Sequence, residues 1–193
     1  MHPAHKRRGF AELLADRRGL LDAPHYPEQV AAIAGVLVAA FRKHNKVLWC
    51  GNGGSAADAQ HLAAEFSGRF LREREGLPSE ALSVNTSTLT SIANDFGYEW
   101  VFARQVEAFV QPGDVVVGIS TSGKSPSVLR ALETARRLGA TTIAFTGNGG
   151  GPLADLADIV LLGPDGYSAL VQEVHITLGH IICDLVEQDL LFA

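Results

Sequence analysis

The sequence lacks the features that mark several classes of protein. It has only two cysteines, Cys50 and Cys183, too few for a disulfide framework or a zinc site built from thiolates. No uninterrupted apolar run approaches the ~18 residues that a membrane span needs. Lys and Arg together number 16 against 21 Asp and Glu, which gives a formal net charge of −5. That balance is not the basic footprint of a nucleic-acid-binding protein.

The N-terminal segment also lacks a secretory signal. A basic patch, His-Lys-Arg-Arg at 5–8, opens the chain, but charged residues interrupt the segment "FAELLADRRGLL" behind it. A signal peptide needs a continuous apolar stretch at that point. We therefore expect a cytoplasmic protein that binds neither nucleic acid nor membranes.

The chain does contain enough apolar sequence for one core. Of its 193 residues, 47% are hydrophobic, and no linker-like stretch divides them, so we expect a single domain over 1–193. In segment 28–45, apolar residues recur with a helical period and the residues between them are also apolar, which predicts a helix buried on more than one side. We expect the N-terminal helices, within about 9–44, to pack on the core or on a partner subunit.

Five short apolar runs, separated by helical stretches, predict the sheet. They are rich in β-branched or aromatic residues and do not alternate strictly with polar ones, as is typical of parallel strands covered on both faces. The runs are 46–50, 81–84, 115–119, 141–145 and 159–162. A crossover helix is expected over 127–139 and a long final helix over 169–190. The pattern predicts an α/β three-layer sandwich with a five-stranded parallel sheet, which binds ligands beyond the carboxyl ends of its strands.

Two loops at predicted strand ends share one arrangement, a glycine- and serine-rich loop between a strand and a helix. "CGNGGSA" and "GISTSGKS" each follow an apolar strand and precede a helix. Glycine lets the backbone approach a ligand closely, and a helix N-terminus presents free N–H groups to an anion. The second loop, at 118–125, fits the nucleotide-binding pattern G-x-x-x-x-G-K-[ST].

The context does not favour a nucleotide. A dinucleotide fingerprint needs an acidic residue at the end of the next strand, but Glu73 and Glu75 lie in a charged loop. A P-loop needs a magnesium-binding aspartate at a strand end, and Asp165 lies three residues beyond one. Four hydroxyl groups in the second loop suit a compact terminal phosphate better than a triphosphate; they belong to Ser120, Thr121, Ser122 and Ser125. The alternative is that both loops are ordinary glycine turns.

Several segments in collinear order over about 26–193 resemble the sugar-isomerase (SIS) family, and within it the phosphoheptose isomerases. They are "CGNGGSAADAQHLAAEF", "ANDFGYEWVFARQVEA", "GDVVVGISTSGKSPSV", "AFTGNGGGPLADLADI" and "VQEVHITLGHIICDLVEQDLL". The resemblance implies a flavodoxin-like sheet and a homotetramer with active sites at subunit interfaces. It also implies one zinc ion per subunit and the interconversion of sedoheptulose 7-phosphate and D-glycero-D-manno-heptose 7-phosphate. In bacteria this reaction supplies heptose for lipopolysaccharide.

The same resemblance implies roles for individual residues. Contacts to the sugar would come from Asn52, Gly53, Gly54, Ser55, Asn94 and Asp95. The phosphate would be held by Ser120, Thr121, Ser122 and Ser125. The metal would be bound by His61, Glu65, Gln172 and His180. Of these, Glu65 and His180 would also move the protons, and Glu65 and Gln172 would contact the substrate.

The chemistry of aldose–ketose isomerisation agrees with this set. The reaction needs a base, an acid for the oxygen, and positive charge to stabilise the enediolate. Glu65 follows His61 by four residues, so both side chains project from one face of a helix. Their nitrogen and oxygen atoms suit a borderline or hard metal. An ordinary exposed pair is the alternative, but the segment around them, "AQHLAAEF", is mostly apolar.

The predicted final helix offers more than one candidate for the fourth metal ligand. Gln172 and His180 lie eight residues apart, about 80° around a helix, whereas Glu173 aligns better with His180. His175 is a third candidate. Helical geometry slightly favours Glu173, and the resemblance selects Gln172. Structural roles for Glu173 and His175 remain the simpler alternative.

One departure from the relatives concerns the residues before Gln172. Relatives usually carry an arginine where this chain has Leu170, and some have an acid where it has Ala169. Arg69, Arg72 or Arg104 would be the candidates to supply a replacement charge.

Two rival functions remain open. One is a regulator of the DnaA initiator-associating type, which has the same fold and lacks the acid–base pair; the presence of Glu65 and His180 favours an enzyme instead. The other is an isomerase of a different sugar phosphate.

Overall fold

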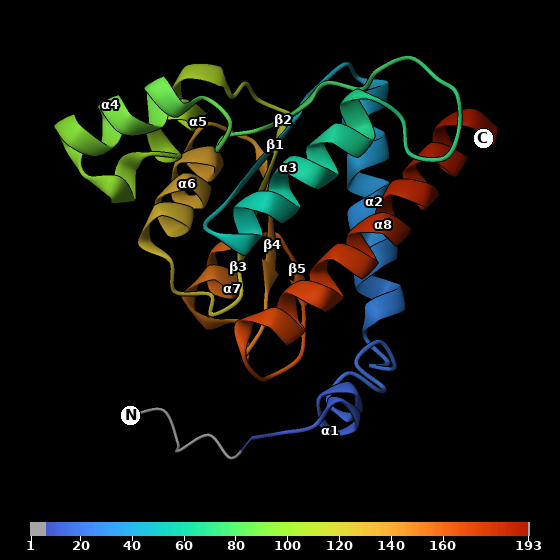
Figure 1. Ribbon diagram of the computed structural model, residues 1–193. Helices are drawn as coiled ribbons and strands as arrows, with labels where there is room; N and C mark the ends of the chain where they lie inside the picture. Colours follow the sequence, from blue (N-terminus) through green and yellow to red (C-terminus); the bar gives the residue numbers. More distant parts are fainter. Residues whose placement is uncertain (1–6, 193) are drawn as a thin grey trace.

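The structure is a computed structural model that describes residues 7–192, so part of the basic patch at 5–8 lies outside the described residues (Figure 1). The helices are α1 (Phe10–Ala15), α2 (Tyr26–Arg42), α3 (Gly54–Ser67), α4 (Thr86–Phe96), α5 (Ala103–Phe109), α6 (Pro126–Arg137), α7 (Gly151–Leu156) and α8 (Ser168–Phe192), with a 3₁₀ turn, η1 (Tyr98–Trp100). The strands are β1 (Val47–Gly51), β2 (Ser79–Ala81), β3 (Val115–Ser120), β4 (Thr141–Thr146) and β5 (Ile159–Leu162).

The five strands form one parallel sheet in the order β2-β1-β3-β4-β5. This is the flavodoxin-like order, in which the direction of winding reverses between β1 and β3. Helices α2, α3 and α8 cover one face of the sheet, and α5, α6 and α7 cover the other (Figure 1). The predicted α/β three-layer sandwich is confirmed, and the two glycine–serine loops flank the point of reversal.

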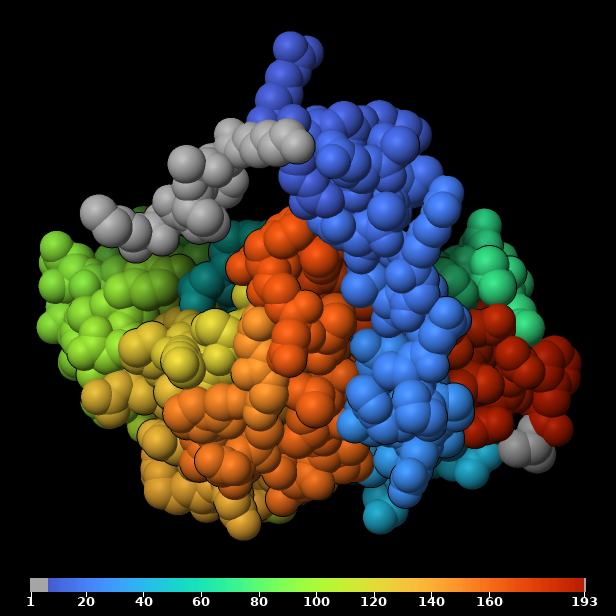
Figure 2. Space-filling model, turned by 90° about the horizontal axis from the view of Figure 1, so that it is seen from below, coloured from blue at the N-terminus to red at the C-terminus, as the bar shows by residue number. Residues whose placement is uncertain are grey.

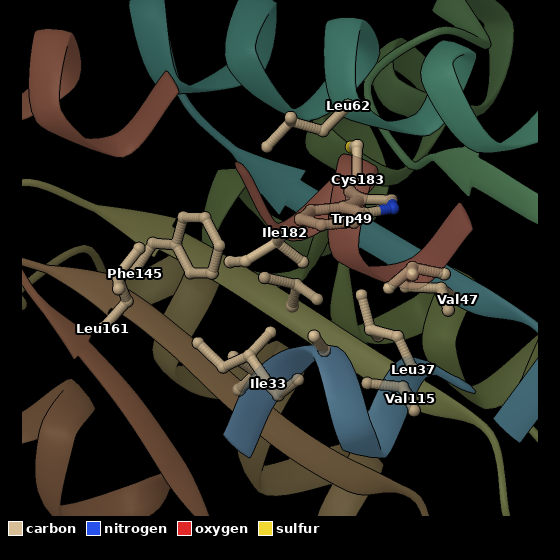
Figure 3. Packing of buried hydrophobic residues seen from close by; sticks show 14 of the residues in the cluster. Ile33, Leu37, Val47, Trp49, Leu62, Val115, Phe145, Leu161, Ile182 and Cys183 are labelled. Carbon is tan, nitrogen blue, oxygen red and sulfur yellow. The ribbon is translucent and has the colours of Figure 1, made fainter. Parts of the chain in front are cut away.

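Both faces of the sheet are buried, which explains why the strands do not alternate with polar residues. On β1, Trp49 faces the cluster under α2, α3 and α8, while Leu48 and Cys50 face the cluster under α5 and α6. Figure 3 shows Trp49 among aliphatic side chains of α2, α3 and α8. Each fully buried side chain of this kind contributes about 1.5–3 kcal/mol. The indole N–H of Trp49 donates to Ser79 Oγ at 2.9 Å, so its one polar atom is satisfied.

The prediction for the second strand is wrong at most of its positions. We expected a strand over 81–84, but β2 ends at Ala81, and the following residues turn toward Asn85, whose side chain accepts from the N–H of Thr88 and caps α4. Leu82 is apolar because it packs into the second cluster, at 2% exposure, and not because it extends the strand.

The N-terminal helices differ in how they pack. Helix α2 lies against α8 and β5 through one broad buried face, whereas Ala31 and Ala32 are exposed, so the prediction of burial on several sides is wrong within the single chain. Helix α1 has no buried residue, and the N-terminal segment stands out from the body of the molecule (Figure 2). It is tied back by Arg17, which pairs with Glu173 at 3.0 Å.

Helix α8 is long and apolar enough to cross a membrane by length and composition, although a few charged residues interrupt it. Half of its most apolar stretch is buried inside the protein against other helices. A core helix has the same properties, so this is weak evidence for a span.

Candidate active site

The loop after β1 is packed tightly at two of its glycines, against backbone at one and against a side-chain amide at the other. A Cβ at Gly51 would lie 2.6 Å from the carbonyl oxygen of Ser55. A Cβ at Gly54 would lie 2.6–2.9 Å from the side-chain amide of Gln172. The close approach brings Gln172 Nε2 to 3.4 Å from Ser55 Oγ. The first turn of α3 and the first turns of α8 therefore meet at this loop.

The loop after β3 is fixed by its own glycine. Gly123 has φ +63°, and a Cβ there would lie 1.9 Å from the carbonyl oxygen of Gly150, so no other residue fits. Within the loop, Thr121 Oγ1 donates to Ser168 Oγ at 3.1 Å. Pro126 occupies the first turn of α6, as expected, where its missing N–H costs nothing.

Asn52 joins the two loops. Its Nδ2 donates to Ser125 Oγ at 2.8 Å and to Ser127 Oγ at 3.0 Å. Its Oδ1 accepts a hydrogen bond from the hydroxyl of Tyr98 at 2.7 Å. The carboxyl ends of β1 and β3 are thus bridged at the point where the winding of the sheet reverses, which is the ligand-binding crevice of this fold class.

A hydroxyl-lined cavity of about 210 Å³ opens beside this bridge. It is lined by Asn52, Ser55, Ile119, Ser120, Thr121, Ser125, Ser168 and Gln172. Six of these residues are substrate contacts implied by the sequence. Ser168, which sequence reasoning missed, is the first residue of α8; a serine at the start of a helix just beyond a strand was the available signal.

A second group of chemically active side chains lies farther along α3 and α8. His61 Nε2 is 3.0 Å from Glu65 Oε1 and 3.0 Å from His180 Nε2. One donor atom from each of the three residues lies within 4.8 Å of the others. The helices approach closely because residue 179 is glycine: a Cβ there would lie 2.7 Å from Leu62. Glu65 and His180 therefore share one site within a single chain.

The donor set fits a metal ion. Ligands held at ~2.0–2.1 Å by a tetrahedral zinc ion lie about 3.4 Å apart, close to the separations observed here. One turn before His61, Asp58 has a buried carboxylate oxygen without a hydrogen-bond partner among the described residues. Burial raises the pKa of Asp58 to about 6, against the opposing charge of His61. Positive charge at His61 would favour the ionised form of this carboxyl group.

The two other candidate ligands on α8, Glu173 and His175, are engaged in structural contacts. Glu173 points to Arg17 on the N-terminal segment. His175 is fully buried, its Nε2 donates to the carbonyl oxygen of Thr146 at 2.9 Å, and burial lowers its pKa to about 4. Gln172 is the one of the three at the cavity. It precedes His180 by eight residues, or about 12 Å along a helix axis, so its amide and the His61–Glu65–His180 group are separate in the single chain.

The remaining predicted contacts lie outside the cavity lining. Asn94 and Asp95 are exposed on the last turn of α4, where the amide of Asn94 donates to the carboxylate of Asp95 at 2.8 Å. Ser122 is exposed and accepts from the backbone N–H of Lys124 at 3.3 Å. Gly53, with φ +56°, caps the start of α3.

Two of the three candidate replacement cations are engaged elsewhere. Arg72 pairs with Asp184, and Arg104 pairs with Glu107. Within residues 7–192, the one ion pair of Arg69 is a long contact of 3.8 Å to Glu73. Leu170 is 7% exposed, so the position where relatives have arginine is part of the apolar interior here.

Comparison with known proteins decides the family. The family model of the SIS domain matches residues 24–147. A phosphoheptose isomerase from Roseiflexus sp. (strain RS-1) is 57% identical over 161 residues, which cover 83% of this chain and 82% of that protein. One from Aquifex aeolicus (strain VF5) is 53% identical over 84% of this chain and 85% of that protein. The chain belongs to the phosphoheptose isomerase family.

Solved structures of the family agree with this assignment. The phosphoheptose isomerase of Francisella tularensis has a TM-score of 0.88 at 33% identity and covers 94% of this chain and 100% of its own. That of Neisseria gonorrhoeae has a TM-score of 0.79 at 39% identity and covers 92% of this chain and 91% of its own. The P-loop pattern at 118–125 lies within the matched SIS domain, so it is the second loop of a phosphoheptose isomerase family member.

Proposed function

We propose that the protein is an aldose–ketose isomerase that converts sedoheptulose 7-phosphate into D-glycero-D-manno-heptose 7-phosphate. Identity above 50% to phosphoheptose isomerases over most of the chain supports this substrate. The observation that carries the proposal is the meeting of Glu65 and His180 at His61, on the two helices that also line the hydroxyl-rich cavity.

The phosphate group belongs at the loop after β3. Its hydroxyl groups, on Ser120, Thr121, Ser122 and Ser125, and the N–H groups at the start of α6 offer short donors to a compact dianion. The sugar would extend from there across Asn52, Gly53, Gly54 and Ser55, with Asn94 and Asp95 joining from α4. This orientation leaves the far end of the sugar to the groups on α3 and α8.

Proton transfer falls to Glu65 and His180. A carboxylate at Glu65 takes the proton from the carbon next to the carbonyl group, exchanges it with solvent while the enediol is bound, and delivers a proton to the neighbouring carbon. The imidazole of His180 exchanges a proton with the oxygens, so that the enediol forms without a free charge. Both side chains are partly accessible, which a group that reacts with substrate requires.

We propose zinc as the metal, one ion per subunit, held by His61, Glu65 and His180. It would supply the positive charge that stabilises an enediolate oxygen. The resemblance adds Gln172 as a ligand. Because the amide of Gln172 lies at Ser55 in its own chain, this residue suits a substrate contact there, and a metal-binding role would require it to come from a neighbouring subunit.

We further propose that the protein works in the cytoplasm as a homotetramer with active sites at subunit interfaces, in bacterial heptose synthesis for lipopolysaccharide. Support for assembly comes from an apolar groove of about 490 Å³ between the start of α2 and α8. Leu21 and Ile181, in this groove, are 48% and 45% exposed in the single chain. Burial of such a surface against another copy would remove it from water.

A steady-state assay of sedoheptulose 7-phosphate with the zinc-loaded protein tests the proposal. Wild type should form the aldose, and Glu65→Gln should lose about 10²–10⁴-fold in kcat, as expected for removal of a general base. Glu73→Gln is the matched control, because that side chain is 95% exposed. Absence of turnover by wild type, or full activity of Glu65→Gln, would refute the proposal.

A further inference from the structure

Three hydrogen bonds form a directed chain into the phosphate loop. The Tyr98 hydroxyl donates to Asn52 Oδ1 at 2.7 Å, and Asn52 Nδ2 donates to Ser125 Oγ at 2.8 Å and Ser127 Oγ at 3.0 Å. We propose that Tyr98 is a positioning residue: its hydroxyl fixes the Asn52 amide so that the Ser125 hydroxyl is free to donate to the substrate phosphate. This inference rests on the proposed function, which places the phosphate at that loop.

The hydroxyl of Tyr98 matters because an amide can face its neighbours in either of two orientations. In the observed orientation, Oδ1 receives the phenol proton and both N–H hydrogens go to serine oxygens. In the flipped orientation, Oδ1 would face Ser125 and Ser127, whose hydroxyl groups would then donate to it. The phenol oxygen can donate or accept, but in the flipped orientation it would accept only one of the two amide hydrogens. The observed orientation satisfies Oδ1 and both N–H hydrogens together, and the donated phenol proton is one of its three bonds.

The orientation of Asn52 decides what Ser125 can do. When Ser125 Oγ accepts from Asn52, its own hydrogen is available for another partner, provided that Ser127 is the donor in the 3.3 Å contact between the two serine hydroxyls. Ser125 lines the cavity together with Ser120 and Thr121, so that hydrogen can point at an anion there. Hydrogen bonds to an anion are about twice as strong as neutral ones, and a chain of aligned donors strengthens each member. If Asn52 flips, the phosphate loses this donor.

The position of Tyr98 argues against a role in core packing. Its side chain is 56% exposed, at the start of η1. It lines a second opening, of about 520 Å³, which shares Asn52 and Ser125 with the substrate cavity. Removing the hydroxyl therefore leaves no buried void. What it removes is the donor that holds Asn52.

The test is Tyr98→Phe, which deletes the hydroxyl alone. We expect KM for sedoheptulose 7-phosphate to rise about tenfold, equivalent to ~1.4 kcal/mol, with kcat within about twofold, because the phosphate is remote from the reacting carbons and its binding is uniform. The dissociation constant of inorganic phosphate, measured by calorimetry, should rise by a similar factor.

A double mutant separates positioning from a general structural effect. In a Ser125→Ala background the hydroxyl that Tyr98 positions is gone, so Tyr98→Phe should add less than about twofold to KM, since coupled residues are not additive. Unchanged KM and phosphate affinity in Tyr98→Phe would overturn the proposal. So would a full tenfold effect that persists without Ser125. If no form turns over the sugar phosphate, the isomerase assignment fails, and the phosphate affinities still decide the role of Tyr98.

Discussion

At the scale of single residues, burial distinguishes the ionisable groups that hold the fold together from those that a substrate can reach. Glu187 is fully buried, yet the N–H groups of Phe70, Leu71 and Arg72 bond to it at 2.9–3.0 Å. Burial alone would raise the pKa of Glu187, but these bonds and Arg74 lower it on balance. This carboxylate anchors the charged loop after α3. The carboxylate of Glu65, by contrast, is partly accessible and faces two imidazoles.

His175 makes the first pH-dependent prediction. Its pKa is about 4 in the folded protein against an ordinary 6.5, so below pH 6.5 the unfolded chain binds a proton that the folded one does not. The free energy of unfolding should fall as the pH drops from 6.5 to 4, by about 3 kcal/mol from this residue. Above pH 6.5 the contribution is constant. Urea unfolding at pH 7 and pH 4.5 measures it.

His175→Gln is the comparison for that prediction, because glutamine keeps an N–H donor for Thr146 but does not titrate. The raised pKa of Asp58 has the opposite effect on stability over part of the same range, so the difference between wild type and variant isolates the histidine. An identical pH dependence in both proteins would show that His175 is not held neutral by the fold.

Sequence alone predicted most residues of the candidate site, but not which of them the fold brings together at the cavity and which at the His61–Glu65–His180 group. The glycine–serine loops and the His61–Glu65 spacing are local patterns, so they could be recognised without coordinates. Helix geometry alone did not choose between Gln172 and Glu173, because the choice depends on tertiary contacts: Gln172 lines the cavity, whereas Glu173 pairs with Arg17. Tyr98 was missed because its partner, Asn52, is distant in sequence and no local pattern joins them.

At the scale of elements, the contact between α3 and α8 brings together the candidate metal-binding group His61, Glu65 and His180. Leu62 lies over Gly179, and this contact sets the distance between the flanking residues His61 and His180. The sequence predicted both helices, since each has a long apolar pattern. It did not predict their crossing point, which depends on the absence of a side chain at one position. The misplaced second strand has a similar cause: Leu82 is apolar for tertiary packing.

Gly179→Ala should therefore harm both stability and metal binding. Overpacking of this kind costs about 1–3 kcal/mol, and displacement of His180 from His61 should weaken zinc affinity at least tenfold. Unfolding in urea and competition with a zinc chelator measure the two effects. Gly35→Ala is the matched control: a Cβ there meets nothing within 4 Å on helix α2, so stability should rise by about 0.5–1 kcal/mol.

Equal effects of the two alanine substitutions would contradict this account of the α3–α8 contact. A loss of stability in Gly179→Ala without a loss of zinc affinity would show that the contact does not position His180.

At the scale of the whole molecule, the single chain exposes apolar surface near its N-terminal helices. This surface comprises the groove between α2 and α8 and the exposed helix α1, in which Phe10 is 81% exposed. The sequence indicated that these helices would pack on the core or on a partner. For α2 the core covers one face, and the remaining residues of the helix are exposed or half-buried in the single chain.

We expect light scattering to give four times the chain mass of 20.5 kDa. Ile181→Asp should yield smaller species, because it places a charge in the groove that a second copy would cover. Val84→Asp, at an exposed apolar position beyond β2, should leave the mass unchanged. A monomeric wild type, or an Ile181→Asp variant that assembles fully, would contradict the proposed tetramer.

The most direct test of the central claim is isomerisation of sedoheptulose 7-phosphate in deuterated water, followed by NMR. If Glu65 and His180 exchange protons with a sugar held by its phosphate, wild type should produce aldose that carries deuterium at the carbon next to the new carbonyl group. Glu65→Gln should produce neither aldose nor exchange. Aldose formed without any solvent deuterium, or undiminished exchange by Glu65→Gln, would contradict the account.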